Sequence, residues 1–163
     1  MQKLIIALLL SLNLNAQNDI LTNQVLKQKI ELDRINDQSK LEGVNHKGAK
    51  VVIDGSSTEN DENPGISPME LVLMGVGGCS SMDILSILKK QKQEVESYKV
   101  LVDSKRSEEI PKVFEQIHVK YIFKGNIDPK KVERAIALSM EKYCSVSIML
   151  EKAAEISWSY EIE

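Results

Sequence analysis

Cysteine, histidine and arginine are all scarce in this sequence, and each scarcity excludes a kind of site. The 163 residues include two cysteines and two histidines. They contain no C-x-x-C pair and no cysteines at the spacing of zinc ligands, so we expect no metal site. A net charge of −3 gives no reason to expect nucleic acid as a partner. The arginines are Arg34, Arg106 and Arg134, so a site that needs a guanidinium must use one of them.

Residues 1–16 (MQKLIIALLLSLNLNA) have the pattern of a secretory signal peptide. A lysine precedes an apolar run, and cleavage is expected after Ala16. The run is too short for a bilayer span, which needs about 20 residues. The alternative is an extension upstream of a misplaced start codon. With cleavage, residues 17–25 form a polar linker and the protein is exported to an oxidising compartment such as the periplasm, whereas without it the protein is cytoplasmic.

Alternating and β-branched segments, separated by turn residues, predict six strands and three helices in one domain over residues 26–163. The expected strands are 29–33, 40–42, 50–54, 97–103, 113–124 and 156–162. The expected helices are 67–90, 128–142 and a short one through 148–150 that Ser145 or Ser147 caps. The order β-β-β-α-β-β-α-α-β places helices between groups of strands. This order predicts an α+β fold with a mainly antiparallel sheet.

The stretch 67–90 is the most apolar long segment after the N-terminus, and the rest of the chain is expected to pack around it. Ser67, Pro68 and Glu70 form a helix start with a capping box. Apolar side chains then cover every side, which is typical of a helix buried all round. One sheet of short strands cannot cover such a helix, so we expect a homodimer in which two copies pack together. The glycines that would permit a close approach are Gly75, Gly77 and Gly78.

The two cysteines occupy different local settings. Cys79 lies in the middle of the apolar helix and can be interpreted as a small buried hydrophobic residue. Cys144 lies at a break between two helices, where the amides that begin the next helix can stabilise a thiolate. From these residues alone, a structural disulfide, a catalytic pair and two inert thiols remain equally open.

Two acidic residues of the central helix bear on Cys79. Asp83, four residues later, lies on nearly the same face at 100° per residue. A carboxylate there disfavours a neighbouring thiolate unless a cation is shared, and Arg34 or Arg106 could supply that cation. Glu70 lies nine residues before Cys79, about 900° away and therefore half a turn out of phase. Its capping role explains it, and it stays a secondary candidate for the chemistry.

Three stretches together resemble the OsmC/Ohr superfamily of organic hydroperoxide reductases. They read SPMELVLMGVGGCSSMDILSILKKQ, SKRSEEIPKVF and VERAIALSMEKYCSVSIMLEKAAEISWSYEI. The motifs P-M-E-L-x-L-x-x-x-G-G-C and E-K-Y-C-S-V within them are long and specific. The likeness covers about residues 26–163 and is closest to the YhfA-like OsmC proteins. It implies the same β-β-β-α-β-β-α-α-β fold, in intertwined homodimers whose central helices pack together with active sites at the interface.

The resemblance also implies a mechanism. Cys79 is then the peroxidatic cysteine, whose thiolate attacks the O–O bond of an organic or fatty-acid hydroperoxide and becomes a sulfenic acid. Cys144 is the resolving cysteine, which closes a Cys79–Cys144 disulfide. An external dithiol, lipoyl-type in characterised members, reduces this disulfide. No metal, flavin or haem is implied as a cofactor, and the biological role would be defence against oxidative stress.

Characterised peroxidases of this superfamily support the reactive cysteine with an arginine from the early strands and a glutamate near the start of the central helix. In the Ohr pattern the glutamate lies ten residues before the cysteine, where this sequence has Met69. Arg34 lies in the region of the arginine, and Arg106, paired with Asp83, is the alternative. Two other interpretations stay open: a ligand-binding or redox-sensing protein with this fold, and a structural dimer with a permanent disulfide or inert thiols.

Overall fold

The computed structural model describes residues 29–55 and 64–163 of the chain. The predicted signal peptide, the linker and most of the loop before the central helix lie outside these ranges. The chain divides into two compact units, Met1–Pro68 and Met69–Glu163, and each is described by itself. The prediction of one domain over residues 26–163 therefore stays a prediction.

The first unit contains the predicted meander of three short antiparallel strands. These are β1 (Ile30–Arg34), β2 (Leu41–Asn45) and β3 (Lys50–Ile53), in the order β1-β2-β3. The predicted turn between β2 and β3 is present. The Oδ1 atom of Asn45 accepts hydrogen bonds from the N–H groups of Lys47 and Ala49, and Gly48 adopts a φ of +81°. That left-handed backbone is why a glycine stands there.

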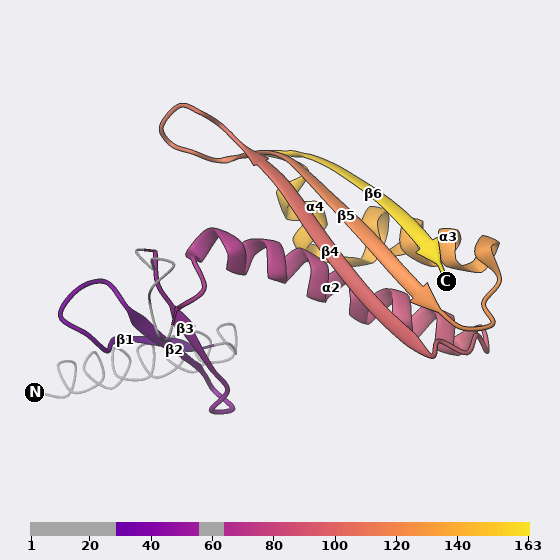
Figure 1. The fold of residues 1–163 in the computed structure, drawn as a ribbon, viewed down its shortest axis with the longest axis horizontal. Helices are drawn as coiled ribbons and strands as arrows, with labels where there is room; N and C mark the ends of the chain where they lie inside the picture. Colours follow the sequence, from indigo (N-terminus) through magenta and orange to yellow (C-terminus); the bar gives the residue numbers. More distant parts are fainter. Residues whose placement is uncertain (1–28, 56–63) are drawn as a thin grey trace, which may run out of the picture. The chain divides into compact units, whose positions relative to one another are not determined.

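The second unit combines one helix-covered sheet with a long helix (Figure 1). Its elements are α2 (Pro68–Lys90), β4 (Ser97–Arg106), β5 (Phe114–Lys124), α3 (Pro129–Leu138), the π-helix η1 (Ser139–Tyr143), α4 (Ser145–Leu150) and β6 (Glu155–Ile162). The strand order is β4-β5-β6, in which β4 and β5 are antiparallel but β5 and β6 are parallel. The α+β class and the element order are confirmed. The parallel pair arises because the helices α3 to α4 carry the chain back before β6 begins, as parallel neighbours require.

The core of this unit lies between the sheet and its helices. Four alternating residues of β5, within the predicted strand 113–124, are all buried, namely Ile117, Val119, Tyr121 and Phe123. Helix α3 begins as predicted, because Asp128 Oδ1 accepts a hydrogen bond from the N–H of Lys130 and Pro129 takes the first helical position. Its buried face is Val132, Ala135 and Ile136. The periodic apolar positions therefore identified the core correctly.

Helix α2 contributes one face to this core and leaves another uncovered in the single chain. Its buried residues are Val76, Gly77, Ser80, Ile84 and Leu88. In contrast, Met74 is 55% exposed and Met82 is 77% exposed. Within one chain the helix is therefore not buried on every side, since a single sheet covers only one side of a helix, and burial of the other side by a second copy stays a prediction. By length and a mean hydropathy of 1.8 α2 could also cross a membrane, but its packed inner face is that of a core helix.

The three glycines of α2 serve different contacts. A Cβ atom on Gly77 would lie 3.1 Å from Val102 Cγ2, so this glycine lets the helix approach β4 of its own chain. A Cβ on Gly75 would lie 3.8 Å from Val146 Cγ1 of α4. A Cβ on Gly78 would meet nothing within 4 Å. Of the three, Gly78 is the one that leaves room for a second molecule.

Candidate active site

The fold brings Cys79 and Cys144 into contact, although they are far apart in the sequence. Cys79 lies in the middle of α2 and is partly exposed, whereas Cys144 precedes α4 and is fully buried. Both are free thiols. Burial is the main cause of the raised pKa of Cys144, and the neighbouring Cys79 thiol raises it further. One thiol of the pair is thus open to approach, whereas the other is enclosed.

A widened helical turn places Cys144. Helix α3 ends at Leu138, earlier than the predicted 142, and the π-helix η1 follows it. The N–H of Cys144 donates to the carbonyl oxygen of Ser139 at 2.8 Å, five residues back. Turns of this kind occur frequently at functional sites. The backbone of Cys144 then becomes extended, with φ −70° and ψ 98°, and α4 begins.

Cys144 itself caps α4, in place of the predicted Ser145 or Ser147. Its Sγ atom accepts a hydrogen bond from the N–H of Ser147 at 3.4 Å. The predicted interaction with the amides of the next helix is therefore present. Burial nevertheless raises the pKa of Cys144, and the hydrogen bond from the Ser147 N–H lowers it only in part. A neutral thiol, not a thiolate, is the resting form of Cys144 because desolvation outweighs one donor.

Tyrosine hydroxyls support the turn of α2 around Cys79. The hydroxyl of Tyr121 donates to Ser80 Oγ at 2.8 Å, and Ser80 Oγ donates to the carbonyl of Val76 at 2.7 Å. The hydroxyl of Tyr98 donates to Ser81 Oγ at 2.9 Å, and burial raises the pKa of Tyr98 to about 12. Tyr98 of β4 and Tyr121 of β5 therefore attach both strands to α2 through neutral phenols. The sequence predicted both strands but did not indicate this role of the tyrosines.

The residues predicted to support Cys79, namely Asp83, Arg106 and Arg34, lie on three different elements of the chain. Ser139 Oγ donates to Asp83 Oδ2 at 3.2 Å, and within residues 29–55 and 64–163 no ion pair joins Asp83 to Arg106. Arg106 instead ends β4, where its Nε donates to the carbonyl of Lys112 at 2.8 Å. Arg34 is exposed at the end of β1 in the first unit. The roles of both arginines stay predictions.

Two cavities adjoin the part of α2 that carries Cys79. One, of about 370 Å³, is lined by Glu70, Leu73, Met74, Gly77, Gly78, Val100 and Val102. Glu70 is thus an exposed residue of a cavity that reaches Gly78, next to Cys79. The other, of about 650 Å³, is lined by Asp83, Ser86, Ile87, Lys90, Gln91, Leu138 and Tyr143. This second cavity begins one helical turn beyond Cys79 and includes the residue before Cys144.

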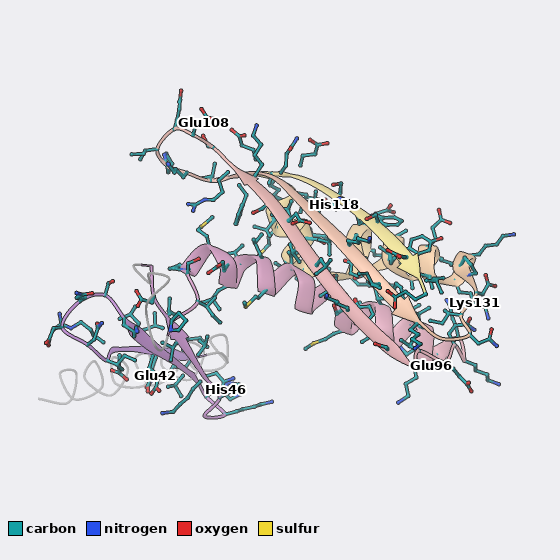
Figure 2. The ribbon with its side chains drawn as sticks, viewed as in Figure 1. Glu42, His46, Glu96, Glu108, His118 and Lys131 are labelled. Atoms are coloured by element: carbon teal, nitrogen blue, oxygen red, sulfur yellow. The ribbon has the colours of Figure 1, made fainter. Side chains whose placement is uncertain are left out.

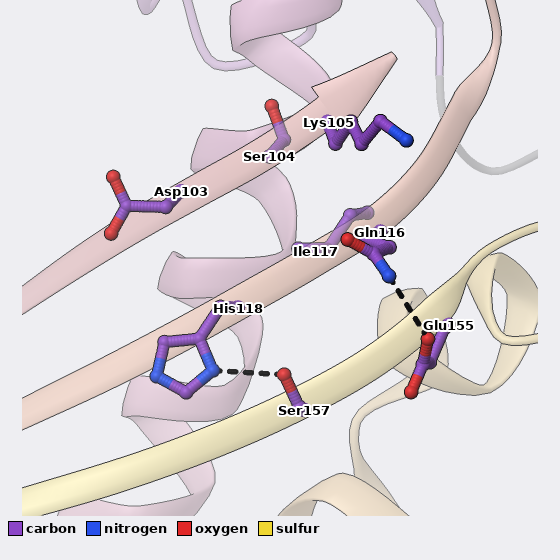
Figure 3. Close-up of a pocket in the computed structure, with 8 residues that line it drawn as sticks. All are labelled: Asp103, Ser104, Lys105, Gln116, Ile117, His118, Glu155 and Ser157. Carbon is purple, nitrogen blue, oxygen red and sulfur yellow. Dashed lines mark hydrogen bonds between the residues drawn. The ribbon is translucent and has the colours of Figure 1, made fainter. Parts of the chain in front are cut away.

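A third hollow, of about 270 Å³, lies on the sheet around His118 and contains neither cysteine (Figure 3). The ring nitrogens of His118 lie 2.8 Å from Ser157 Oγ and 2.9 Å from Ser159 Oγ, so strand neighbours satisfy them. His46 follows β2 in the first unit and His118 lies on β5 in the second (Figure 2). Across the described parts of the chain, no three potential metal ligands gather. The cysteine pair is therefore the strongest candidate site.

Comparisons with known proteins give this geometry a context. Residues 58–159 match the family model described as OsmC-like protein. Protein YhfA of Escherichia coli (strain K12) is 46% identical over 121 residues, which cover 74% of this chain and 87% of YhfA. A hypothetical protein from Aquifex aeolicus VF5, of known crystal structure, is 34% identical, with a TM-score of 0.71 over 83% of this chain and 97% of that one. The organic hydroperoxide resistance protein OhrB of Bacillus subtilis shares the fold, with a TM-score of 0.58 and 15% identity over 82% of this chain and 97% of that one.

Proposed function

Because this chain belongs to the OsmC-like protein family, we propose that it is a thiol peroxidase that reduces organic hydroperoxides to alcohols. A protein of the same fold is named for resistance to organic hydroperoxides. The observation that carries the proposal is the proximity of a partly exposed Cys79 to a buried Cys144, close enough for each thiol to influence the other. This is the arrangement that a peroxidatic and a resolving cysteine require.

Cys79 is the thiol that would react first, because Cys144 has no exposed surface. The Cys79 thiolate attacks one oxygen of the hydroperoxide, so that an S–O bond forms and the O–O bond breaks. The departing alkoxide takes a proton and leaves as an alcohol. The sulfur is oxidised to a sulfenic acid while the peroxide is reduced. Arg34 and Arg106 stay the candidates for the cation beside this sulfur.

Cys144 would then resolve the sulfenic acid. Its thiolate attacks the Cys79 sulfur, so that an S–S bond forms, the S–O bond breaks, and the hydroxide takes a proton and leaves as water. An external dithiol reduces the disulfide by exchange and is itself oxidised to a disulfide. The N–H of Ser147, which already bonds the Cys144 sulfur, supports its negative charge during both steps.

The cavity that ends at Gly78, the residue before Cys79, supports an organic substrate. The cavity that reaches Gly78 is lined mainly by apolar side chains, from Leu73, Met74, Val100 and Val102. An alkyl or aryl hydroperoxide gains free energy by burying its apolar part there, whereas hydrogen peroxide has no such part. This supports organic hydroperoxides as the substrate class and oxidative-stress defence as the role.

An apolar stripe on α2 supports a homodimer. Met74, Met82 and Leu85 are 55%, 77% and 36% exposed, and at 100° per residue they share one side of the helix with Gly78. Apolar surface of this kind on a soluble protein marks an interaction site. The stripe is best covered by the same stripe of a second copy, because Gly78 leaves space for a neighbouring backbone.

The resolving step is expected to accelerate as the pH rises. Burial raises the pKa of Cys144, so its thiolate fraction grows about tenfold per pH unit from about pH 6 to the ordinary thiol value of about 8.5. The rate of disulfide formation should grow equally and level off only above that value. Fluorescence of Trp158, the single tryptophan, can follow it by stopped flow, because Trp158 shares a cavity with Met140 and Ser147.

A plateau of this rate below about pH 8 would contradict the raised pKa. The raised pKa of Cys144 can also be tested at equilibrium, through the free energy of unfolding. The unfolded thiol ionises before the folded one, so the free energy of unfolding should fall as the pH rises through the ordinary thiol value. The Cys144→Ser variant should lack this part of the decline.

The proposed function is tested by peroxide consumption with dihydrolipoamide, regenerated by lipoamide dehydrogenase and NADH. The wild type is expected to consume cumene and tert-butyl hydroperoxide faster than the Cys79→Ser variant does, and faster than it consumes hydrogen peroxide. A wild-type rate equal to that of Cys79→Ser would contradict the proposed peroxidase activity. If the Cys79–Cys144 disulfide still formed without turnover, the alternative of a redox-sensing protein would remain.

A further inference from the structure

The hydroxyl of Ser139 joins the helix that carries Cys79 to the segment that carries Cys144. Ser139 is fully buried at the start of η1. Its Oγ atom lies 3.2 Å from Asp83 Oδ2 and 3.3 Å from the carbonyl oxygen of Ser80, both on α2. Ser80 follows Cys79 directly and Asp83 comes one turn later, so the hydroxyl contacts the helical turn that begins at Cys79.

The backbone of the same residue holds Cys144. The carbonyl oxygen of Ser139 accepts the N–H of Cys144 at 2.8 Å. Beyond it, Ser147 donates its N–H to the Cys144 sulfur and its hydroxyl to the carbonyl of Met140 at 2.9 Å. Ser139 therefore joins Asp83 of α2 to the backbone of Cys144, while Ser147 bonds the Cys144 sulfur and the carbonyl of the residue after Ser139.

The hydroxyl of Ser139 donates its one proton to α2, to either Asp83 Oδ2 or the Ser80 carbonyl oxygen, and not to its own helix. Serine within a helix ordinarily bonds a carbonyl of the preceding turn, and alanine favours helix more. A buried hydroxyl is tolerated where it is hydrogen-bonded, as it is here to α2. The serine therefore contributes a link between elements at a place where alanine would suit the helix better.

We propose that Ser139 is a positioning residue for the Cys79–Cys144 disulfide. This inference rests on the pairing of the two cysteines in the proposed function. The hydroxyl fixes the distance between the two backbones, so it raises the effective concentration of the Cys144 sulfur at the Cys79 sulfur. A higher effective concentration stabilises the disulfide relative to the two thiols. Without the hydroxyl, η1 retains its backbone bond to Cys144 but loses this attachment to α2.

The test is a thiol–disulfide equilibrium of the Ser139→Ala variant in glutathione redox buffers, with free thiols trapped and counted by mass spectrometry. One buried hydrogen bond contributes about 1 kcal/mol, so the equilibrium constant for disulfide formation should fall about five- to tenfold. This corresponds to a reduction potential about 20 to 30 mV less negative. Ser145→Ala is the matched control, because Ser145 is exposed and adjoins Cys144, and it should stay within about twofold of wild type.

Four results would overturn the positioning role. The first is a Ser139→Ala constant within about twofold of wild type, and the second is an equal shift in Ser145→Ala. The third is loss of folded structure in reduced Ser139→Ala, which would make the residue merely structural. The fourth is a wild-type chain that forms no Cys79–Cys144 disulfide in any buffer. This experiment contains no peroxide, so its outcome is independent of the peroxidase assay. A protein without peroxidase activity can still show the shift in the thiol–disulfide equilibrium, and an active peroxidase can lack that shift.

Discussion

A Cys144→Ser variant is expected to reduce about one equivalent of cumene hydroperoxide per chain and then stop. Cys79 stays intact in this variant, so the first oxidation proceeds, but its sulfenic acid has no neighbouring thiol to form a disulfide. Steady turnover with a dithiol should fall about a hundredfold or more. A thiol held beside the reacting sulfur acts at an effective concentration that a dissolved reductant cannot reach.

Peroxide loss against protein concentration gives the stoichiometry, and dimedone labelling with peptide mass spectrometry locates the sulfenic acid on Cys79. Cys79→Ser should show neither the single equivalent nor the label. Ser145→Ala, an exposed change beside Cys144, should keep full turnover. Undiminished turnover by Cys144→Ser would mean that the dithiol attacks oxidised Cys79 directly, and Cys144 would lose its proposed role.

Replacing Met82 with glutamate is expected to convert the proposed homodimer to monomers. Met82 is 77% exposed in the single chain and lies on the apolar stripe of α2, so the fold of each chain should survive. At a two-fold symmetric interface the change buries two carboxylates that lack partners, which costs several kcal/mol. Since each 1.4 kcal/mol is a factor of ten, the dissociation constant should rise about a thousandfold or more.

Light scattering during size-exclusion chromatography measures the mass of each variant directly. Met149→Glu is the matched control, because Met149 is 63% exposed but lies on α4, and this variant should stay dimeric. A monomeric wild type would refute the homodimer itself. A Met82→Glu protein that stayed dimeric would place the interface on another surface.

Periodicity allowed most of the fold to be predicted. Alternation identified the buried face of β5, and a cap followed by proline located the start of α3. The expected strand 97–103 ended at Asp103, yet β4 continues to Arg106 because its backbone pairs with β5 as far as Phe114. Local polarity carries no information about such pairing. The parallel β5–β6 pair was missed for the same reason, since strand direction depends on the whole connection between them.

The candidate site was predictable in part. Sequence motifs identified both cysteines. Their proximity depends on how α2 and α4 pack, and the spacing of residues in the sequence does not reveal that packing. The contributions of Ser139 and Ser147 were not predicted, because hydrogen bonds between elements leave no periodic pattern. Helical phase placed Asp83 beside Cys79 but could not show that its hydrogen-bond donor is Ser139, since that contact comes from a separate helix.

The π-helix η1 makes the orientation of the second cysteine depend on one wide turn. A bond from residue 144 to residue 139 encloses one residue more than the α-helical repeat does. If the same residues formed a regular α-helix, the position of Cys144 would rotate by about 100° around its axis. A relative that kept both cysteines but lacked the wide turn would therefore separate them in space. Conservation of the cysteines alone is an incomplete criterion for a reactive pair, and the wide turn between 138 and 144 belongs beside it.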